Sequence, residues 1–398
     1  MTVLTKYLLL GALALSAVNA QDSSSSVDST PTPSGDESAS SPSTSPDTDA
    51  AATPVAGNGN ASGFQFKETY PADSAKPSPK PEWMQIIANA NITDAPVVKA
   101  NGENGPQQQG DADPYCDWTF TTCTRDTDIV TCPKGQWGIT YDDGPTDFSP
   151  KLYDYLKETN QKATFFMIGG QVVKYPDYAK RAFDEGHELA MHTWTHSYMT
   201  TLSTEQIVAE LKWNELAIKE VTGYSPRFFR PPYGDIDDRV RSIAKALGFT
   251  PVIWNYDTDD WMVAETPGFQ EQWIDGNATQ WAAAAANTNE GGISLEHDLY
   301  EKTVDAAIRI LPTLQKAYKV TTVGQCTGQQ SYKEGTAPNN STSAAPSASS
   351  SGVAANGSTQ ANGEQSKDQE GAASRSMDSR TAIGVAAFIG AVSSYLFI

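Results

Sequence analysis

One stretch decides how this sequence folds, namely Gly135-Gln136-Trp137-Gly138-Ile139-Thr140-Tyr141-Asp142-Asp143-Gly144-Pro145. An apolar run that ends abruptly in two adjacent acids is typical of a buried strand with carboxylates at its C-terminal end. The Gly-Pro pair then breaks the strand. Because barrels place their chemistry at the carboxyl ends of their strands, the stretch predicts a site at one rim of a sheet.

Strands and helices alternate regularly around this stretch. Strands are predicted at 136–141, 163–168, 188–191, 227–230, 250–256, 292–295 and 318–323. Helices are predicted at 148–159, 171–185, 203–222, 238–247, 269–286 and 302–317, and Ser203 forms a capping box with Gln206, three positions further on. Strands joined by such helices run parallel. The pattern therefore predicts an α/β fold, a (β/α)7 barrel one strand short of the usual eight, with a doubly wound open sheet as the alternative.

Both ends of the chain carry targeting patterns. Residues 1–20 combine an early cation, an apolar run and a small-residue cleavage pattern, which predict a secretory signal peptide and not a membrane anchor. Residues 374–398 hold a polar spacer and an uncharged, mostly apolar tail, and the small trio Gly371-Ala372-Ala373 precedes them. This order predicts a GPI-anchor signal that is removed, with a tail-anchored helix as the alternative.

Composition divides the rest of the chain into a leader, a domain and a tether. Residues 21–113 are a leader, whose first part to residue 66 has six acids, no Lys or Arg and abundant Ser, Thr and Pro, and is predicted to be disordered. Its second part is a partly ordered linker in which 83–87 can form a short docked helix. Residues 114–328 are the predicted folded domain. Residues 329–373 are a low-complexity tether.

Charge and sequons define the surroundings of the protein. A formal charge of −20, from 28 Lys+Arg against 48 Asp+Glu, argues against nucleic acid as a partner. Glycosylation sequons begin at Asn60, Asn91, Asn277, Asn339, Asn340 and Asn356. Together with the terminal signals they predict a secreted glycoprotein, held by a lipid anchor at the plasma membrane and cell wall of a eukaryote. No oligomeric state is predicted.

Four cysteines are present, which in an exported chain favours disulfides. Cys132 just precedes the first predicted strand and Cys326 just follows the last, so a bond between them would close the seam of a seven-stranded barrel. Cys116 and Cys123 would then close a small local loop. Four cysteines allow three pairings, and a zinc cluster is a further alternative that the absence of CxxC spacing disfavours.

Two of the four histidines lie in a metal-ligand pattern. His192 and His196 follow the strand 188–191, and imidazoles four apart can converge on one ion. With Asp143 as the carboxylate ligand they would form an open site for Zn²⁺, Co²⁺ or another divalent transition ion. Consecutive residues of a strand point apart, so Asp142 can instead take a proton from bound water. The alternative is that the two acids only cap a turn.

Three further predicted strands end in groups that handle charge or protons. Arg230-Pro231-Pro232-Tyr233-Gly234 is a rigid turn that can aim Arg230 at a carboxylate and the Tyr233 N–H at an oxyanion. Asp257 through Trp261 supplies an acid to orient a catalytic group, and an indole wall. His297 follows the strand 292–295 and is a candidate proton donor. Convergence at one rim is a stronger signal than any single motif.

In this order the motifs resemble those of polysaccharide deacetylases of carbohydrate esterase family 4, and among these the GPI-anchored fungal chitin deacetylases. The resemblance covers about Cys132 to Cys326. Its five motifs are Thr140 through Pro145, His192 through His196, Arg230 through Gly234, Asp257 through Trp261, and Leu295 through His297. Tyr141 stands where the family usually has Phe.

The resemblance implies a distorted (β/α)7 barrel and metal-dependent hydrolysis of the N-acetyl groups of chitin to chitosan and acetate. The implied roles are metal binding by Asp143, His192 and His196, general base for Asp142, general acid for His297, tuning of His297 by Asp260, orientation of Asp142 by Arg230, oxyanion binding by the Tyr233 amide, and an acetyl pocket of Trp261 and Leu295. The alternatives are a deacetylase of another acetylated glycan and an inert chitin-binding mannoprotein of the wall.

Overall fold

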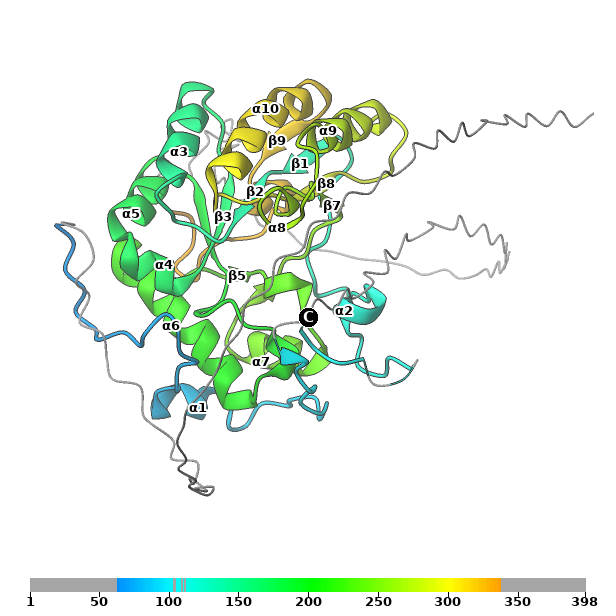
Figure 1. The fold of residues 1–398 in the computed structure, drawn as a ribbon. Coiled ribbons are helices and arrows are strands. Elements are labelled where there is room, and N and C mark those ends of the chain that lie inside the picture. The colour runs from blue at the N-terminus through cyan, green and yellow to red at the C-terminus, as the bar shows by residue number, and fades with distance from the viewer. Residues whose placement is uncertain (1–62, 103–104, 109, 111, 338–398) are drawn as a thin grey trace, which may run out of the picture. The chain divides into compact units, whose positions relative to one another are not determined.

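The computed structural model describes residues 63–337 except 103, 104, 109 and 111 (Figure 1). The predicted signal peptide and anchor signal lie outside the described residues, as do the predicted tether from residue 338 on, the leader to residue 62 and the sequons at Asn60, Asn339, Asn340 and Asn356. Of the two described sequons, Asn91 is exposed and Asn277 is half-buried. Within the described part, no helix combines the length and apolar character needed to cross a bilayer.

The strands form two parallel sheets. The first has the order β2-β3-β4-β5-β6 and the second the order β7-β8-β1-β9. Their bounds are β1 Gln136–Gly138, β2 Thr140–Asp142, β3 Thr164–Met167, β4 Glu188–Met191, β5 Phe228–Phe229, β6 Thr250–Pro251, β7 Tyr256–Asp257, β8 Gly292–Leu295 and β9 Lys319–Thr321. All pairings between these strands are parallel, as the helical crossovers require.

Chain continuity closes the two sheets into one barrel. β1 and β2 are halves of one predicted strand, because β1 pairs with β8 and β9 whereas β2 pairs with β3. β6 and β7 are likewise halves of the predicted strand 250–256, paired with β5 and β8. A parallel bridge between Asp142 and His297 joins β2 to the end of β8. The structure is therefore a distorted seven-stranded barrel and not an open doubly wound sheet.

Helices surround the strands (Figure 1). They are α1 Pro81–Ile87, α2 Trp118–Thr121, α3 Ser149–Glu158, α4 Gly169–Lys174, α5 Pro176–Asp184, α6 Thr204–Thr222, α7 Asp238–Ala246, α8 Met262–Glu265, α9 Gln272–Ala284, α10 Glu301–Ala317 and α11 Val323–Thr327. The prediction of one helix at 171–185 was wrong, because Pro176 starts a new helix and has no N–H to continue the previous one. The capping box of Ser203 and Gln206 is confirmed.

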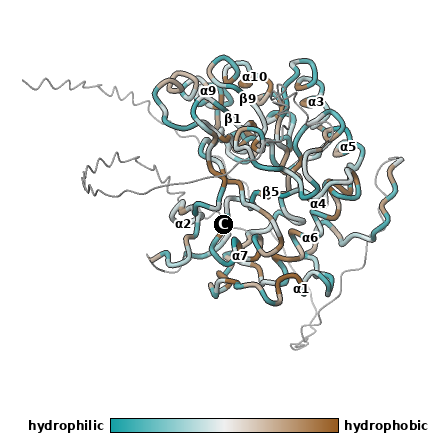
Figure 2. Tube along the Cα trace, turned by 180° about the vertical axis from the view of Figure 1, so that it is seen from behind, coloured by the Kyte–Doolittle hydropathy of each residue, from teal (hydrophilic) through white to brown (hydrophobic). Residues whose placement is uncertain are grey.

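Both faces of the strands are buried. Phe166 and Phe228 lie in an apolar cluster with Cys132, whereas their neighbours Phe165 and Phe229 belong to the larger cluster that includes the helices. This double burial explains why the strands are continuous apolar runs in the sequence. Figure 2 shows hydrophilic and hydrophobic residues interspersed along the outer helices α3, α9 and α10.

Segments at both ends of the domain pack against the barrel. The disulfides are Cys132–Cys326 and Cys116–Cys123, the pairing that we expected. The short helix expected at 83–87 is present as α1, and it packs on α6 through an indole pair, Trp83 and Trp213, with ring centroids 4.9 Å apart. Tyr332 is fully buried, so the folded chain continues past the predicted domain boundary at 328.

Candidate active site and metal centre

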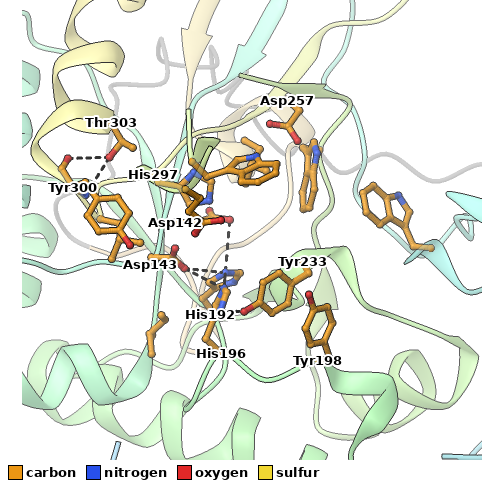
Figure 3. A pocket seen from close by; sticks show the side chains of 17 residues that line it. Asp142, Asp143, His192, His196, Tyr198, Tyr233, Asp257, His297, Tyr300 and Thr303 are labelled. Carbon is orange, nitrogen blue, oxygen red and sulfur yellow. Dashed lines mark hydrogen bonds and ion pairs between the residues drawn. The ribbon is translucent and has the colours of Figure 1, made fainter. Parts of the chain in front are cut away.

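Three side chains from two strand ends meet at one point of the barrel rim (Figure 3). Asp143 Oδ1 lies 3.4 Å from His192 Nε2 and 3.3 Å from His196 Nε2. The two Nε2 atoms are 3.1 Å apart. Asp143 follows β2 and the histidines follow β4, so the parallel register of the sheet brings together residues that are about fifty positions apart in the chain.

Unusual backbone conformations aim these ligand atoms. Asp143 has a φ of 76° and His196 a φ of 59°, values that non-glycine residues rarely adopt. Because Asp143 leaves the strand conformation, it lines the same cavity as Asp142 instead of pointing away from it. The next position, 144, requires a glycine, because a Cβ there would lie 2.3 Å from the Asp298 carboxylate. The strain of this turn is thus coupled to the position of the carboxylates.

The residues present fit a divalent cation. His192 Nδ1 faces the Arg230 carbonyl oxygen at 2.8 Å, and His196 Nδ1 faces the Tyr233 hydroxyl at 3.1 Å. If each Nδ1 carries the proton, each Nε2 presents its lone pair. Asp143 Oδ1 is buried without a hydrogen-bond partner in the described part of the chain. Three acceptor atoms in mutual contact, with no proton between them, are what a metal ion would satisfy.

The protonation states of these ligands agree with that fit. Burial lowers the pKa of His196 to about 4, so its ring is neutral at pH 7, as a metal ligand must be. Burial alone would raise the pKa of Asp143, but the charge that His196 carries at low pH and a hydrogen bond from His192 outweigh it and lower that pKa. The carboxylate is therefore ionised and available as a ligand.

Asp142 is held by a buried arginine. Arg230 Nη1 donates to Asp142 Oδ1 at 2.8 Å and to Thr140 Oγ1 at 2.8 Å, and the guanidinium is 0% exposed. Burial raises the pKa of Asp142, and the charge of Arg230 opposes that rise. The second oxygen, Oδ2, lies 3.9 Å from His192 Nε2. One oxygen of Asp142 is thus fixed from behind and the other faces the metal ligands, as a proton acceptor beside a metal would be.

His297 is paired with a buried carboxylate. Its Nδ1 lies 2.7 Å from Asp260 Oδ1, and its backbone N–H donates to Asp260 Oδ2 at 2.8 Å. Burial alone would lower the pKa of His297, but the attraction of Asp260 outweighs it and raises the pKa to about 10. The imidazole is therefore protonated at neutral pH, with Nε2–H available to donate.

These groups open into one cavity of about 610 Å³. Of the predicted site residues, those that line it are Asp142, Asp143, His192, His196, Tyr233, Trp261, Leu295 and His297. Arg230 and Asp260 lie behind the side chains they hold. Tyr233 has a φ of 60° within the turn Pro232–Gly234, and its ring stacks on Tyr198 with centroids 3.9 Å apart.

Sequence reasoning missed several aromatic walls of the cavity. These are Trp118, Tyr198, Trp254 and Tyr300. None of them belongs to a motif with a fixed spacing. Only for Tyr198 was a signal available, because it lies two residues beyond the second histidine of the pair, in the same loop.

Comparison with known proteins places this geometry in a family. The polysaccharide deacetylase family profile matches residues 130–252. Chitin deacetylase 1 of Cryptococcus neoformans var. grubii is 40% identical over 265 residues, which cover 62% of this chain and 55% of the relative. Chitin deacetylase of Amylomyces rouxii is 41% identical over 254 residues, covering 60% of each chain. Chitin deacetylase 1 of Saccharomyces cerevisiae is 35% identical over 220 residues, covering 55% of this chain and 69% of the relative.

Fold and site together define a distorted seven-stranded barrel whose rim carries an Asp-His-His group suited to a metal ion. The chain belongs to the polysaccharide deacetylase family. It spans little more than half the length of the first two relatives, 55% and 60%.

Proposed function

We propose that this protein hydrolyses the N-acetyl groups of chitin and releases acetate and chitosan. The observation that supports this most directly is the placement of three chemical groups around one cavity. They are a metal-ligand set, a carboxylate held by Arg230 and a protonated His297. Hydrolysis of an amide needs these functions, because a water must be activated, an oxyanion stabilised and an amine protonated as it leaves.

Each step can be assigned to a residue of this chain. A divalent ion bound by Asp143, His192 and His196, which we propose to be Zn²⁺, would polarise the acetamide carbonyl and acidify water. Asp142 accepts the proton of the attacking water while Arg230 holds its Oδ1. The Tyr233 backbone N–H donates to the oxyanion. His297 then gives its Nε2 proton to the leaving nitrogen, so that the C–N bond breaks and acetate and a free amine result.

The lining of the cavity favours a neutral sugar polymer. Among the described residues that line it, none is Lys or Arg, whereas Asp257 and Glu265 belong to the lining. An anionic polymer would be repelled, but an acetylated amino sugar would not, and its amine product is attracted by the carboxylates. We propose that Trp261 and Leu295 flank the acetyl methyl group, as apolar walls of a small pocket.

Acetate release from defined substrates tests this proposal. Purified protein is incubated with chitin hexamer or with acetylated xylan, after EDTA treatment and after addition of Zn²⁺ or Co²⁺. We expect release from chitin hexamer that depends on added metal and little release from xylan. Equal rates on both would favour the broader reading, a deacetylase of another glycan. No release with any metal, together with retained chitin binding, would favour the inert mannoprotein.

We further propose that the protein is exported and held at the cell surface by a GPI anchor. The patterns at 1–20 and 374–398 support this, and so do two disulfides, which persist in oxidising compartments. Treatment of membranes from an expressing fungal cell with a phosphatidylinositol-specific phospholipase should release the protein into solution. Retention on the membranes would instead indicate a spanning tail.

A further inference from the structure

One wall of the cavity comes from a segment upstream of the residues that the family profile matches. Trp118 begins the short helix α2, inside the loop that the Cys116–Cys123 disulfide closes. It lines the same cavity as Asp142 and His297. Neither the sequence motifs nor the mechanism above gives this tryptophan a role.

The loop that carries Trp118 is held firmly on the barrel. The Trp118 N–H donates to the Ile236 carbonyl oxygen at 3.0 Å, and Thr119 Oγ1 donates to Asp235 Oδ1 at 2.7 Å. Arg241 Nη1 donates to the Cys116 carbonyl oxygen at 2.6 Å. The indole is therefore pre-positioned, so little side-chain entropy would be lost when it contacts a ligand.

The indole packs directly on the turn that carries Tyr233. A Cβ at Gly234 would lie 2.2 Å from the Trp118 ring, and Gly234 has a φ of +72°. The Trp254 ring meets Trp118 edge to face, with centroids 4.9 Å apart. Trp118 thus lies beside the turn that offers the Tyr233 amide.

The cavity already exposes other aromatic rings. Tyr233, Trp261 and Tyr300 are 48%, 37% and 38% exposed, and they are three of the seven large apolar side chains that the described residues leave exposed. Exposed rings gathered at one cavity mark a binding surface. A sugar ring offers a flat face of C–H groups, and an aromatic ring is the rigid apolar partner for such a face.

We infer that Trp118 is a substrate-binding residue, whose indole forms the wall for a sugar unit beyond the immediate neighbour of the one that is deacetylated. This inference rests on the proposed function and extends it to a subsite. Its consequence is a dependence on chain length, because only an oligomer long enough to reach the indole gains the contact.

The test compares Trp118→Ala and Trp118→Phe with a matched control, Trp273→Ala. Trp273 is 54% exposed on α9 and is not among the residues that line the cavity. The values of kcat and KM are measured on chitin oligomers from dimer to hexamer, and hexamer binding is measured by calorimetry. Thermal unfolding and metal content are recorded for every variant.

For Trp118→Ala we expect KM on the hexamer to rise roughly 3- to 10-fold, the range of one aromatic contact. The value of kcat on every oligomer, and KM on the dimer, should stay nearly unchanged. Hexamer binding should weaken by the same factor. Trp118→Phe should lie between wild type and alanine, and Trp273→Ala should match wild type.

Two results would overturn the inference. A loss in kcat that is equal for all oligomers would mean that Trp118 only supports the turn at Gly234. Unchanged KM and unchanged hexamer binding would mean that the indole touches no sugar. If wild-type protein released no acetate but Trp118→Ala still weakened hexamer binding, the deacetylase proposal would fail while the subsite would stand.

Discussion

Replacing Asp260 by asparagine removes one charge behind His297 and changes little else. Asp260 accepts two hydrogen bonds from His297, at 2.7 Å from the ring and 2.8 Å from the backbone. An asparagine can keep one of them. Opposite charges about 4 Å apart interact by about 4 kcal/mol at an effective dielectric constant of 20. Losing an interaction of about 4 kcal/mol lowers a pKa by roughly 3, so the pKa of His297 should fall from about 10 to about 7.

The change should appear as a shifted pH profile. A general acid works only while it is protonated, so the basic limb of kcat for Asp260→Asn should move down by about 3 units. At pH 8 about one-tenth of the variant would carry the proton, which lowers the rate roughly tenfold. At pH 6 the two proteins should differ by less than about twofold. Acetate release from chitin hexamer between pH 5.5 and 10 measures both.

Two matched variants show whether the effect is specific. His297→Asn should lose about 10²- to 10⁴-fold at every pH, because the acid itself is gone. Asp257→Asn removes a nearby carboxylate that lines the cavity but has no hydrogen bond to His297, and it should shift the basic limb far less. If the profile of Asp260→Asn superimposed on that of wild type, or fell equally at all pH values, Asp260 would not set the pKa of His297.

Other predictions concern the metal, a disulfide and the pH dependence of stability. Asp142→Asn should keep bound metal and lose at least about 10²-fold in kcat, whereas His192→Ala should lose the metal; equal metal content by elemental analysis would contradict this division. Replacing Cys132 and Cys326 together by serine should lower the free energy of unfolding by about 2–5 kcal/mol, and an unchanged urea midpoint would oppose this. Burial and a neighbouring carboxylate raise the pKa of Asp117 to about 7, so its contribution to stability is full below about pH 4 and is lost as pH rises through 7. In Asp117→Asn, the midpoint of thermal unfolding should fall less steeply as the pH rises from about 4 to about 7 than it does in the wild type. The same pH dependence in both proteins would exclude this contribution of Asp117.

Local sequence predicted the elements but not where strands change partners. All seven predicted strands exist, because double burial requires continuous apolar runs. The strand 136–141 is nevertheless split at Ile139. Its N–H donates a hydrogen bond to the Thr321 carbonyl oxygen, and its own carbonyl oxygen accepts one from the Thr164 N–H. A change of partner depends on the curvature of the closed barrel, which no local pattern records. Proline, by contrast, was a local signal for the break at Pro176 that was overlooked.

The same distinction holds for the site. The sequence by itself determined the chemistry, because an acid pair and a histidine pair at strand ends must share a rim when the strands are parallel. It did not determine that Asp142 and Asp143 face one cavity, since this follows from the φ of 76° at Asp143. Only the tertiary structure added Trp118, because a lone aromatic in a disulfide-closed loop has no periodicity, and its place beside Gly234 depends on contacts between distant parts of the chain.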